Sequence, residues 1–117
     1  MKDVIYINEL VGVRFDLALD QLENGLGFVY QGVWIRKEYG VLRCEAVSPT
    51  SAECLTEAAA TALIEHARSL VDRLRVSNSR FNSLTHDLKL RFCVIEDYGT
   101  GTAVIVELVG NELVWSL

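Results

Sequence analysis

Apolar and polar side chains alternate along residues 28–47 with the two-residue period of β-strands. The first part of this segment is apolar on both sides, with Phe28, Tyr30 and Trp34 on one and Val29, Val33 and Ile35 on the other. A second run follows a turn that ends at Gly40, so the segment predicts a β-hairpin. Because both sides of its first strand are apolar, we expect a helix to cover one face and another element or a second subunit to cover the other.

Four shorter apolar runs complete the β pattern. Residues 4–7 suit a strand near the N-terminus, and residues 88–95, 103–109 and 113–115 suit three more. The last two runs are separated by Gly110-Asn111, which fits a two-residue hairpin turn with glycine first. The sequence thus predicts β structure on both sides of a central helical region.

A long amphipathic helix is predicted over residues 50–75. Thr50 and Glu53 have the spacing of a capping box, in which each side chain bonds the backbone N–H of the other residue. Behind them, apolar side chains recur every three or four positions, which is the period of one helix face: Leu55, Ala59, Leu63, Ala67, Leu70 and Leu74. Residues 75–86 are rich in serine and asparagine, and we expect a loop or a frayed helix end there.

Residues 8–24 fit two structures. A helix would begin at Asn8, end at Asn24-Gly25 and carry an apolar face made of Val11, Phe15, Ala18, Leu19 and Leu22. A strand would explain the alternation of Val13, Phe15, Leu17 and Leu19, and Gly12 weakens a helix. We favour the helix.

Together these elements predict an α+β fold. We expect an antiparallel sheet of five or six strands, with the long helix packed on one face and a second, shorter helix near the N-terminus. The order of the strands stays open. The chain has one proline, no internal repeat and no low-complexity segment, so we expect residues 1–117 to form a single domain.

The chain is acidic, with 16 Asp and Glu residues against 11 Lys and Arg residues and a formal net charge of −5. This charge disfavours nonspecific binding to nucleic acid or to an anionic membrane. No apolar run is long enough to span a bilayer, and Asp3 and Glu9 near the N-terminus are unlike a secretory signal. We therefore expect a protein partner rather than nucleic acid or membrane.

Three cysteines, Cys44, Cys54 and Cys93, lie in apolar surroundings and lack the spacing of metal ligands. An odd set of such thiols is typical of the reducing cytoplasm, which is the expected location. We expect all three to serve in packing, with Cys54 the most reactive because it falls in the first turn of the predicted helix. No metal or cofactor is predicted.

Basic residues gather in one segment, because residues 68–91 hold six basic residues and two acidic ones. Arginine near a helix end binds phosphate or carboxylate through its planar guanidinium group. His66, just before this segment, and His86, within it, are the candidates for acid–base chemistry. No nucleophile or pocket can be located beside either histidine from the sequence, so a structural role is favoured for both.

We favour a small acidic cytosolic protein–protein interaction domain, such as an inhibitor or immunity-type protein that neutralises a basic partner by charge complementarity, rather than an enzyme. The predicted partner-binding residues are exposed acidic groups and one tyrosine at a hairpin tip: Asp16, Asp20, Glu23, Glu38, Asp97 and Tyr98. Three more carboxylates extend this surface where they are exposed: Glu45, Glu53 and Glu57. A homodimer through an apolar sheet face is compatible with this function, with Trp34 and Trp115 as interface anchors.

The alternative is a homo-oligomeric protein or enzyme that binds a small anion. Its site would consist of arginines and histidines from the basic segment: Arg68, Arg73, Arg75, Arg80, His66 and His86. A cavity in which at least two arginines and a histidine meet separates this hypothesis from the first. Nucleic-acid binding through the same segment is the least favoured function, because the chain as a whole is acidic.

Overall fold

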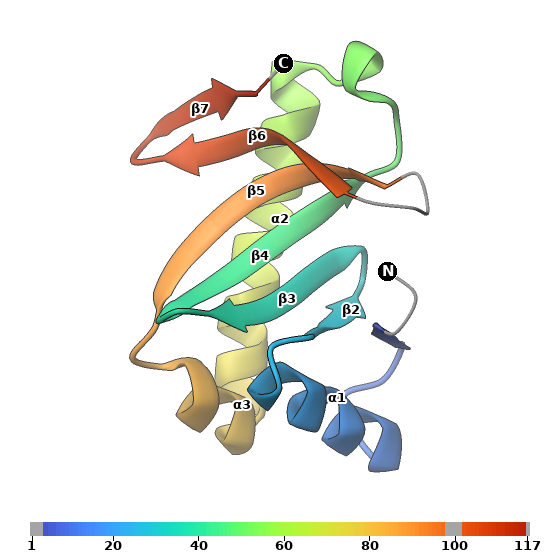
Figure 1. The fold of residues 1–117 in the computed structure, drawn as a ribbon, viewed down its shortest axis with the longest axis vertical. Helices are drawn as coiled ribbons and strands as arrows, with labels where there is room; N and C mark the ends of the chain where they lie inside the picture. The colour runs from blue at the N-terminus through green and yellow to red at the C-terminus, as the bar shows by residue number, and fades with distance from the viewer. Residues whose placement is uncertain (1–3, 98–101, 117) are drawn as a thin grey trace.

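Seven β-strands lie side by side in one sheet, in the same order as they occur along the chain (Figure 1). The strands are β1 (Ile5–Ile7), β2 (Phe28–Tyr30), β3 (Val33–Glu38), β4 (Val41–Ser48), β5 (Lys89–Asp97), β6 (Thr102–Val109) and β7 (Glu112–Trp115). The helices are α1 (Val13–Glu23), α2 (Glu57–Ser77) and α3 (Ser79–Thr85), with a short 3-10 helix, η1 (Ala52–Cys54). This computed structural model describes residues 4–97 and 102–116. The α+β class is confirmed, with more strands than the five or six that were predicted.

The sheet is mixed, so the prediction of an antiparallel sheet was only partly right. Strands β1 and β2 are parallel, as are β4 and β5, while the other neighbouring pairs are antiparallel. Helix α1 connects the first parallel pair, and α2 with α3 connects the second. Each helical connection leads the chain back to the level at which the preceding strand began, so the next strand runs in the same direction.

The predicted first strand of the hairpin is two strands. Gln31 and Gly32 have positive φ angles of 49° and 75° and form a two-residue turn between β2 and β3. Tyr39 and Gly40, with φ angles of 48° and 78°, form the corresponding turn between β3 and β4. Two consecutive residues with positive φ match the twist of the flanking strands. Gln31 is not a typical turn residue, and apolar side chains continue on both sides of the turn. The turn was therefore not predicted from the sequence.

Helix α2 begins later than predicted, because Thr56 and not Thr50 is its N-cap. The Thr56 hydroxyl oxygen accepts a hydrogen bond from the backbone N–H of Ala59. Glu53 lies in η1 and not in α2. The backbone N–H of Ala52, also in η1, donates a hydrogen bond to the Glu96 carboxylate and so connects η1 to β5. The capping box at Thr50 and Glu53 is therefore absent.

Two shorter helices close one end of the molecule. Helix α1 confirms the helical interpretation of residues 8–24, although its N-cap is Gly12 and not Asn8. Helix α3 occupies part of a segment predicted as a loop or a frayed helix end. The Asn78 side chain accepts a hydrogen bond from the backbone N–H of Phe81 and so begins a new helix. The Phe81 ring is buried edge-to-face against Phe28, as the ring of Phe15 from α1 is.

All three α-helices lie on one face of the sheet, and α2 crosses its middle, packing mainly on β4 and β5 (Figure 1). Helices α1 and α3 sit together at the β1–β3 end. Helix α2 runs across the strands, from the β6–β7 end, where it begins, toward α3 at the other end (Figure 1). Its first half lies beside the β6–β7 hairpin, with a groove between them.

No helix in residues 4–97 and 102–116 is both long enough and apolar enough to cross a membrane.

Candidate functional site

A groove of about 520 Å³ lies between α2 and the β6–β7 hairpin. We call it the β7 groove. One side is a single stripe of α2: Glu57, Thr61, Ile64, Glu65 and Arg68. The other side comes from the hairpin: Leu108, Gly110, Asn111, Glu112, Leu113 and Trp115. The stripe repeats every three or four residues, so the groove follows directly from the helical period of α2.

The sheet side of the β7 groove is an edge strand. Leu113 and Trp115 alternate along β7 and are half-buried, and both line the groove toward α2. Between them, Val114 points to the opposite face of the sheet and is 47% exposed. The floor of the groove is therefore apolar and only partly shielded by the chain's own atoms.

The rim of the β7 groove carries net negative charge. Glu57 and Glu65 of α2 are exposed, and within the described residues no ion pair or side-chain hydrogen bond reaches either of them. Glu112 also lines the groove, but the alternation along β7 directs its side chain to the same face as that of Val114, away from α2. The one cation of the rim, Arg68, holds its guanidinium 5.3 Å from the centre of the Phe92 ring. Two unpaired carboxylates against one arginine favour a cationic ligand.

The predicted acidic residues lie at separate places. Asp16, Asp20 and Glu23 are exposed on α1, where Arg80 of α3 binds Asp20 at 2.6 Å and Glu23 at 3.3 Å. These hydrogen bonds, first the one to Asp20, raise the pKa of Arg80. Glu38 lies at the end of β3 and binds Arg43 at 3.4 Å. Asp20 and Glu23 thus hold α1 and α3 together.

Two of the predicted partner-binding residues cannot be placed. The Asp97 side chain and Tyr98 lie outside the described residues. Among the additional carboxylates, Glu53 and Glu57 are exposed near the start of α2, whereas Glu45 is buried. Glu57 is the one residue of that acidic set that lines the β7 groove.

The residues of the predicted anion site have different neighbours. Arg75 donates hydrogen bonds to the Thr85 hydroxyl at 3.2 Å and to the Thr85 carbonyl at 2.7 Å. His66 Nε2 lies 2.9 Å from the Gln31 carbonyl oxygen, and His86 bonds the backbone of its own helix. Arg68 lines the β7 groove, Arg73 lines a different cavity, and neither cavity is lined by a histidine.

That second cavity lies on the other flank of α2, has about the same volume of 520 Å³ and is mostly apolar. Its lining combines one residue before α1, one from β2 and the second half of α2: Leu10, Tyr30, Leu70, Asp72, Arg73, Leu74, Val76 and Ser77. Since its charged pair, Asp72 and Arg73, is balanced, the charge of this cavity favours neither sign of ligand.

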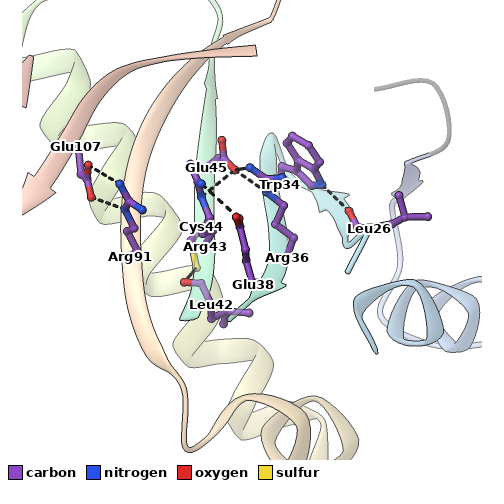
Figure 2. A network of polar contacts seen from close by, with 10 residues as sticks. All are labelled: Leu26, Trp34, Arg36, Glu38, Leu42, Arg43, Cys44, Glu45, Arg91 and Glu107. Carbon is purple, nitrogen blue, oxygen red and sulfur yellow. Dashed lines mark hydrogen bonds and ion pairs between the residues drawn. The ribbon is translucent and has the colours of Figure 1, made fainter. Parts of the chain in front are cut away.

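The helix-free face of the sheet carries a network of ion pairs (Figure 2). Arg36, Arg43 and Arg91 are in register across β3, β4 and β5. Arg36 binds Glu45 at 2.9 Å, and Arg91 donates two hydrogen bonds to Glu107, with Nη2 at 2.9 Å from Oε2. Each arginine of the row thus faces a carboxylate of its own sheet.

Glu45 is the centre of this network. Its side chain is 1% exposed, and its Oε1 atom lies 2.9 Å from Arg36 and 3.5 Å from Arg43 (Figure 2). The Arg36 guanidinium in turn stacks 4.4 Å from the Trp34 ring centre, and the Trp34 indole donates a hydrogen bond to the Leu26 carbonyl. A buried carboxylate needs such partners, because an unpaired buried charge is strongly destabilising. The network pairs the Glu45 charge, although the buried Arg43 Nε atom, 3.5 Å from Glu45 Oε1, makes no hydrogen bond within the described residues.

The two cysteines of the sheet, Cys44 and Cys93, are poor nucleophiles. Burial, the largest cause, raises the pKa of Cys44 and of Cys93 to about 12 in each case. Cys54 in η1 is exposed. The packing role predicted for the thiols thus holds for the two buried ones and not for Cys54.

The β7 groove was not predicted from the sequence. Its nearest signal was the alternation of Leu113 and Trp115, which predicts a strand but not that the strand forms the edge of the sheet. In the described part of the chain, no group of three or more His, Cys, Asp or Glu side chains is arranged to hold a metal ion. Compared with protein-family models, with curated proteins and with solved structures, the chain matches none of them.

Proposed function

We propose that this chain is a protein-recognition domain that binds a basic segment of a partner protein in the β7 groove. The observation that carries the proposal is an apolar floor beneath a rim on which two glutamates of α2, Glu57 and Glu65, have no ionic partner among the described residues. Other exposed carboxylates are paired with an arginine of the same chain, as Asp20 and Glu23 are, or lie away from this groove, as Asp16 does.

The floor of the groove supplies the apolar part of the binding free energy. Trp115 and Leu113 are half-buried in the free protein, so a partner side chain placed over them removes the remaining apolar surface from water. Each Å² removed contributes roughly 25 cal/mol. Tryptophan is also among the residues that most often dominate binding at protein interfaces.

The rim supplies the charge selectivity. A lysine or arginine side chain can lay its aliphatic stem on the apolar floor and place its charged end beside Glu57 or Glu65. The net charge of −5 and the exposed carboxylates of α1 add a long-range field that speeds the approach of a basic partner. This mode of binding fits an inhibitor or immunity-type protein that neutralises a basic protein.

A displayed library of random dodecapeptides tests the proposal. Peptides selected on the wild-type protein are expected to be enriched in Lys and Arg and to bind more weakly as salt increases. Reversing the rim charges with Glu57→Lys and Glu65→Lys together is expected to weaken their binding at least about tenfold, equivalent to 1.4 kcal/mol. Binding is measured by isothermal titration calorimetry.

The matched control reverses two exposed carboxylates away from the groove, with Glu9→Lys and Asp16→Lys. It has the same net charge as the rim variant, so a purely long-range effect would weaken binding equally in both. The proposal is abandoned if no basic peptide is enriched, or if the two double variants lose the same affinity while both retain the wild-type circular dichroism spectrum.

A further inference from the structure

The outer edge of β7 is open. Strand β7 is the last of the sheet and pairs with β6 on one side only. On its other side, no strand formed by residues 4–97 or 102–116 is hydrogen-bonded to it. An edge of this kind presents backbone N–H and C=O groups that a further strand can bind.

The hairpin geometry identifies which groups face outward. Val109 and Glu112 flank the two-residue turn that begins at Gly110, whose φ is 62°. The pair that closes such a turn exchanges both backbone hydrogen bonds, and bonded pairs then alternate along the hairpin. Glu112 and Val114 therefore bond to β6, and the 2.8 Å bond from the Ser116 N–H to the Ile105 carbonyl continues the same alternation.

Leu113 and Trp115 thus direct their backbone N–H and C=O groups to the free edge. The same two residues direct their side chains into the β7 groove. A strand paired with them would place every second side chain over the groove, beside Leu113, Trp115 and the α2 stripe. The backbone edge and the side-chain groove are therefore adjacent parts of one binding surface.

We infer that the basic segment binds as an eighth strand, hydrogen-bonded to Leu113 and Trp115 at the free edge of β7. This inference rests on the proposed function and specifies its geometry. The segment is extended, its groove-facing positions are apolar or carry long basic side chains, and its affinity depends on backbone hydrogen bonds as well as on charge.

The charge of the rim selects a basic segment over a second copy of this chain. A copy paired edge to edge through β7 would bring a second set of Glu57 and Glu65 to the same interface. It would also bring together two chains of net charge −5. Like charges at an interface oppose association, whereas a segment rich in Lys or Arg gains from the same carboxylates.

Amide hydrogen exchange on the wild-type protein, followed by NMR with a selected basic dodecapeptide, tests the inference directly. We expect the Leu113 and Trp115 amides to exchange at least about tenfold more slowly when the peptide is bound, because their N–H groups become hydrogen-bonded. The Val114 amide, already bonded to β6, is expected to change less. The readout requires no substitution in the sheet.

Two substitutions at one position give an independent readout. Leu113→Pro removes the outward N–H, whereas Leu113→Ala keeps it and removes the side chain beyond Cβ. We expect the proline variant to lose at least about tenfold more peptide affinity than the alanine variant. In the peptide, N-methylation is expected to abolish binding at alternate positions only.

The outcomes separate this inference from the proposed function. Rim-dependent peptide binding without slower exchange at Leu113 and Trp115 overturns strand addition and leaves groove recognition intact. Absence of any basic ligand overturns both. Protection of the two amides that increases with the concentration of the protein alone overturns the choice of occupant, because a second copy then occupies the edge.

Discussion

On the face of the sheet that carries the helices, the two ends differ in how completely their side chains are buried. At the β1–β3 end, α1 and α3 enclose an edge-to-face cluster of Phe15, Phe28 and Phe81. At the β6–β7 end no described helix lies over Leu113 and Trp115, and both side chains stay half-buried beside α2. The chain therefore buries one end of this face more completely than the other.

Charge follows the same division. At the closed end, Arg80 binds Asp20 and Glu23, and the ion pairs connect α3 with α1. At the open end, Glu57 and Glu65 border the groove without an ionic partner among the described residues. The division of charge is not complete, because Asp16 on α1 is also exposed without an ionic partner among the described residues. Glu57 and Glu65 differ from Asp16 in bordering an apolar groove, and recognition is therefore expected at their end.

The largest expected difference comes from the same substitution at each end. Leu22 on α1 is 0% exposed, and Leu22→Ala should lower the free energy of unfolding by about 3–5 kcal/mol through lost burial and a residual cavity. Leu113→Ala at the half-buried edge should lower it by about 1 kcal/mol or less. Urea denaturation followed by circular dichroism measures both. Equal losses would show that the β7 groove is part of the core and contradict the comparison.

Local patterns predicted much of this fold. The apolar face of α1, the turn at Gly110 and the second half of the α2 stripe (Ala67, Leu70 and Leu74) are each encoded within a few consecutive residues, and each was found in the structure. In the first half of α2 the predicted stripe was wrong, because Ala60 and Ile64 are buried and Ala59 is exposed. Non-local choices were not predictable in the same way. Thr50 and Thr56 are both capable N-caps, and the sequence does not show that Glu96 would bind the Ala52 N–H and favour η1 over an earlier helix start.

The candidate site was still less accessible to sequence reasoning. An acidic residue in an alternating strand is expected to face solvent, yet Glu45 is buried because Arg36 and Arg43 from the same sheet face surround it. Likewise, Glu57 and Trp115 are far apart in sequence, and only the position of α2 beside the last strand brings them to one groove. Charge counts indicated a basic partner without locating where it would bind.

A smaller difference in stability is expected on the helix-free face, between a buried glutamate, Glu45, and a partly exposed one, Glu107. Glu45→Gln removes the charge that two arginines share and should lower the free energy of unfolding by about 2–3 kcal/mol. Glu107→Gln removes a 24% exposed partner of Arg91 and should cost less than about 1 kcal/mol. Urea denaturation of the two variants at neutral pH checks this order. A larger loss for Glu107→Gln would contradict it.

The smallest expected effect is a pH dependence at the open end. Hydrogen bonds from Arg91 lower the pKa of Glu107 below its ordinary value of 4.5, although burial acts in the opposite direction. Because the pKa is lower in the folded protein than in the unfolded chain, the pair stabilises the fold above pH 4.5, and this stabilisation is lost as the pH falls through the folded-state pKa. The pair joins β6, and with it the hairpin of the groove, to β5.

Glu107→Gln should therefore be less stable than wild type at neutral pH by less than about 1 kcal/mol, and at a second pH below 4.5 the difference should be smaller. Arg91→Gln should remove the same pH-dependent difference, and the double variant should add nothing further, because both substitutions break one pair. Urea denaturation of the four proteins at the two pH values completes the cycle. If the difference in stability between Glu107→Gln and wild type grows as the pH falls, the Glu107 carboxylate is not stabilised by Arg91. The β6–β7 hairpin would then be attached to β5 by backbone hydrogen bonds and apolar side chains, without a contribution from this ion pair.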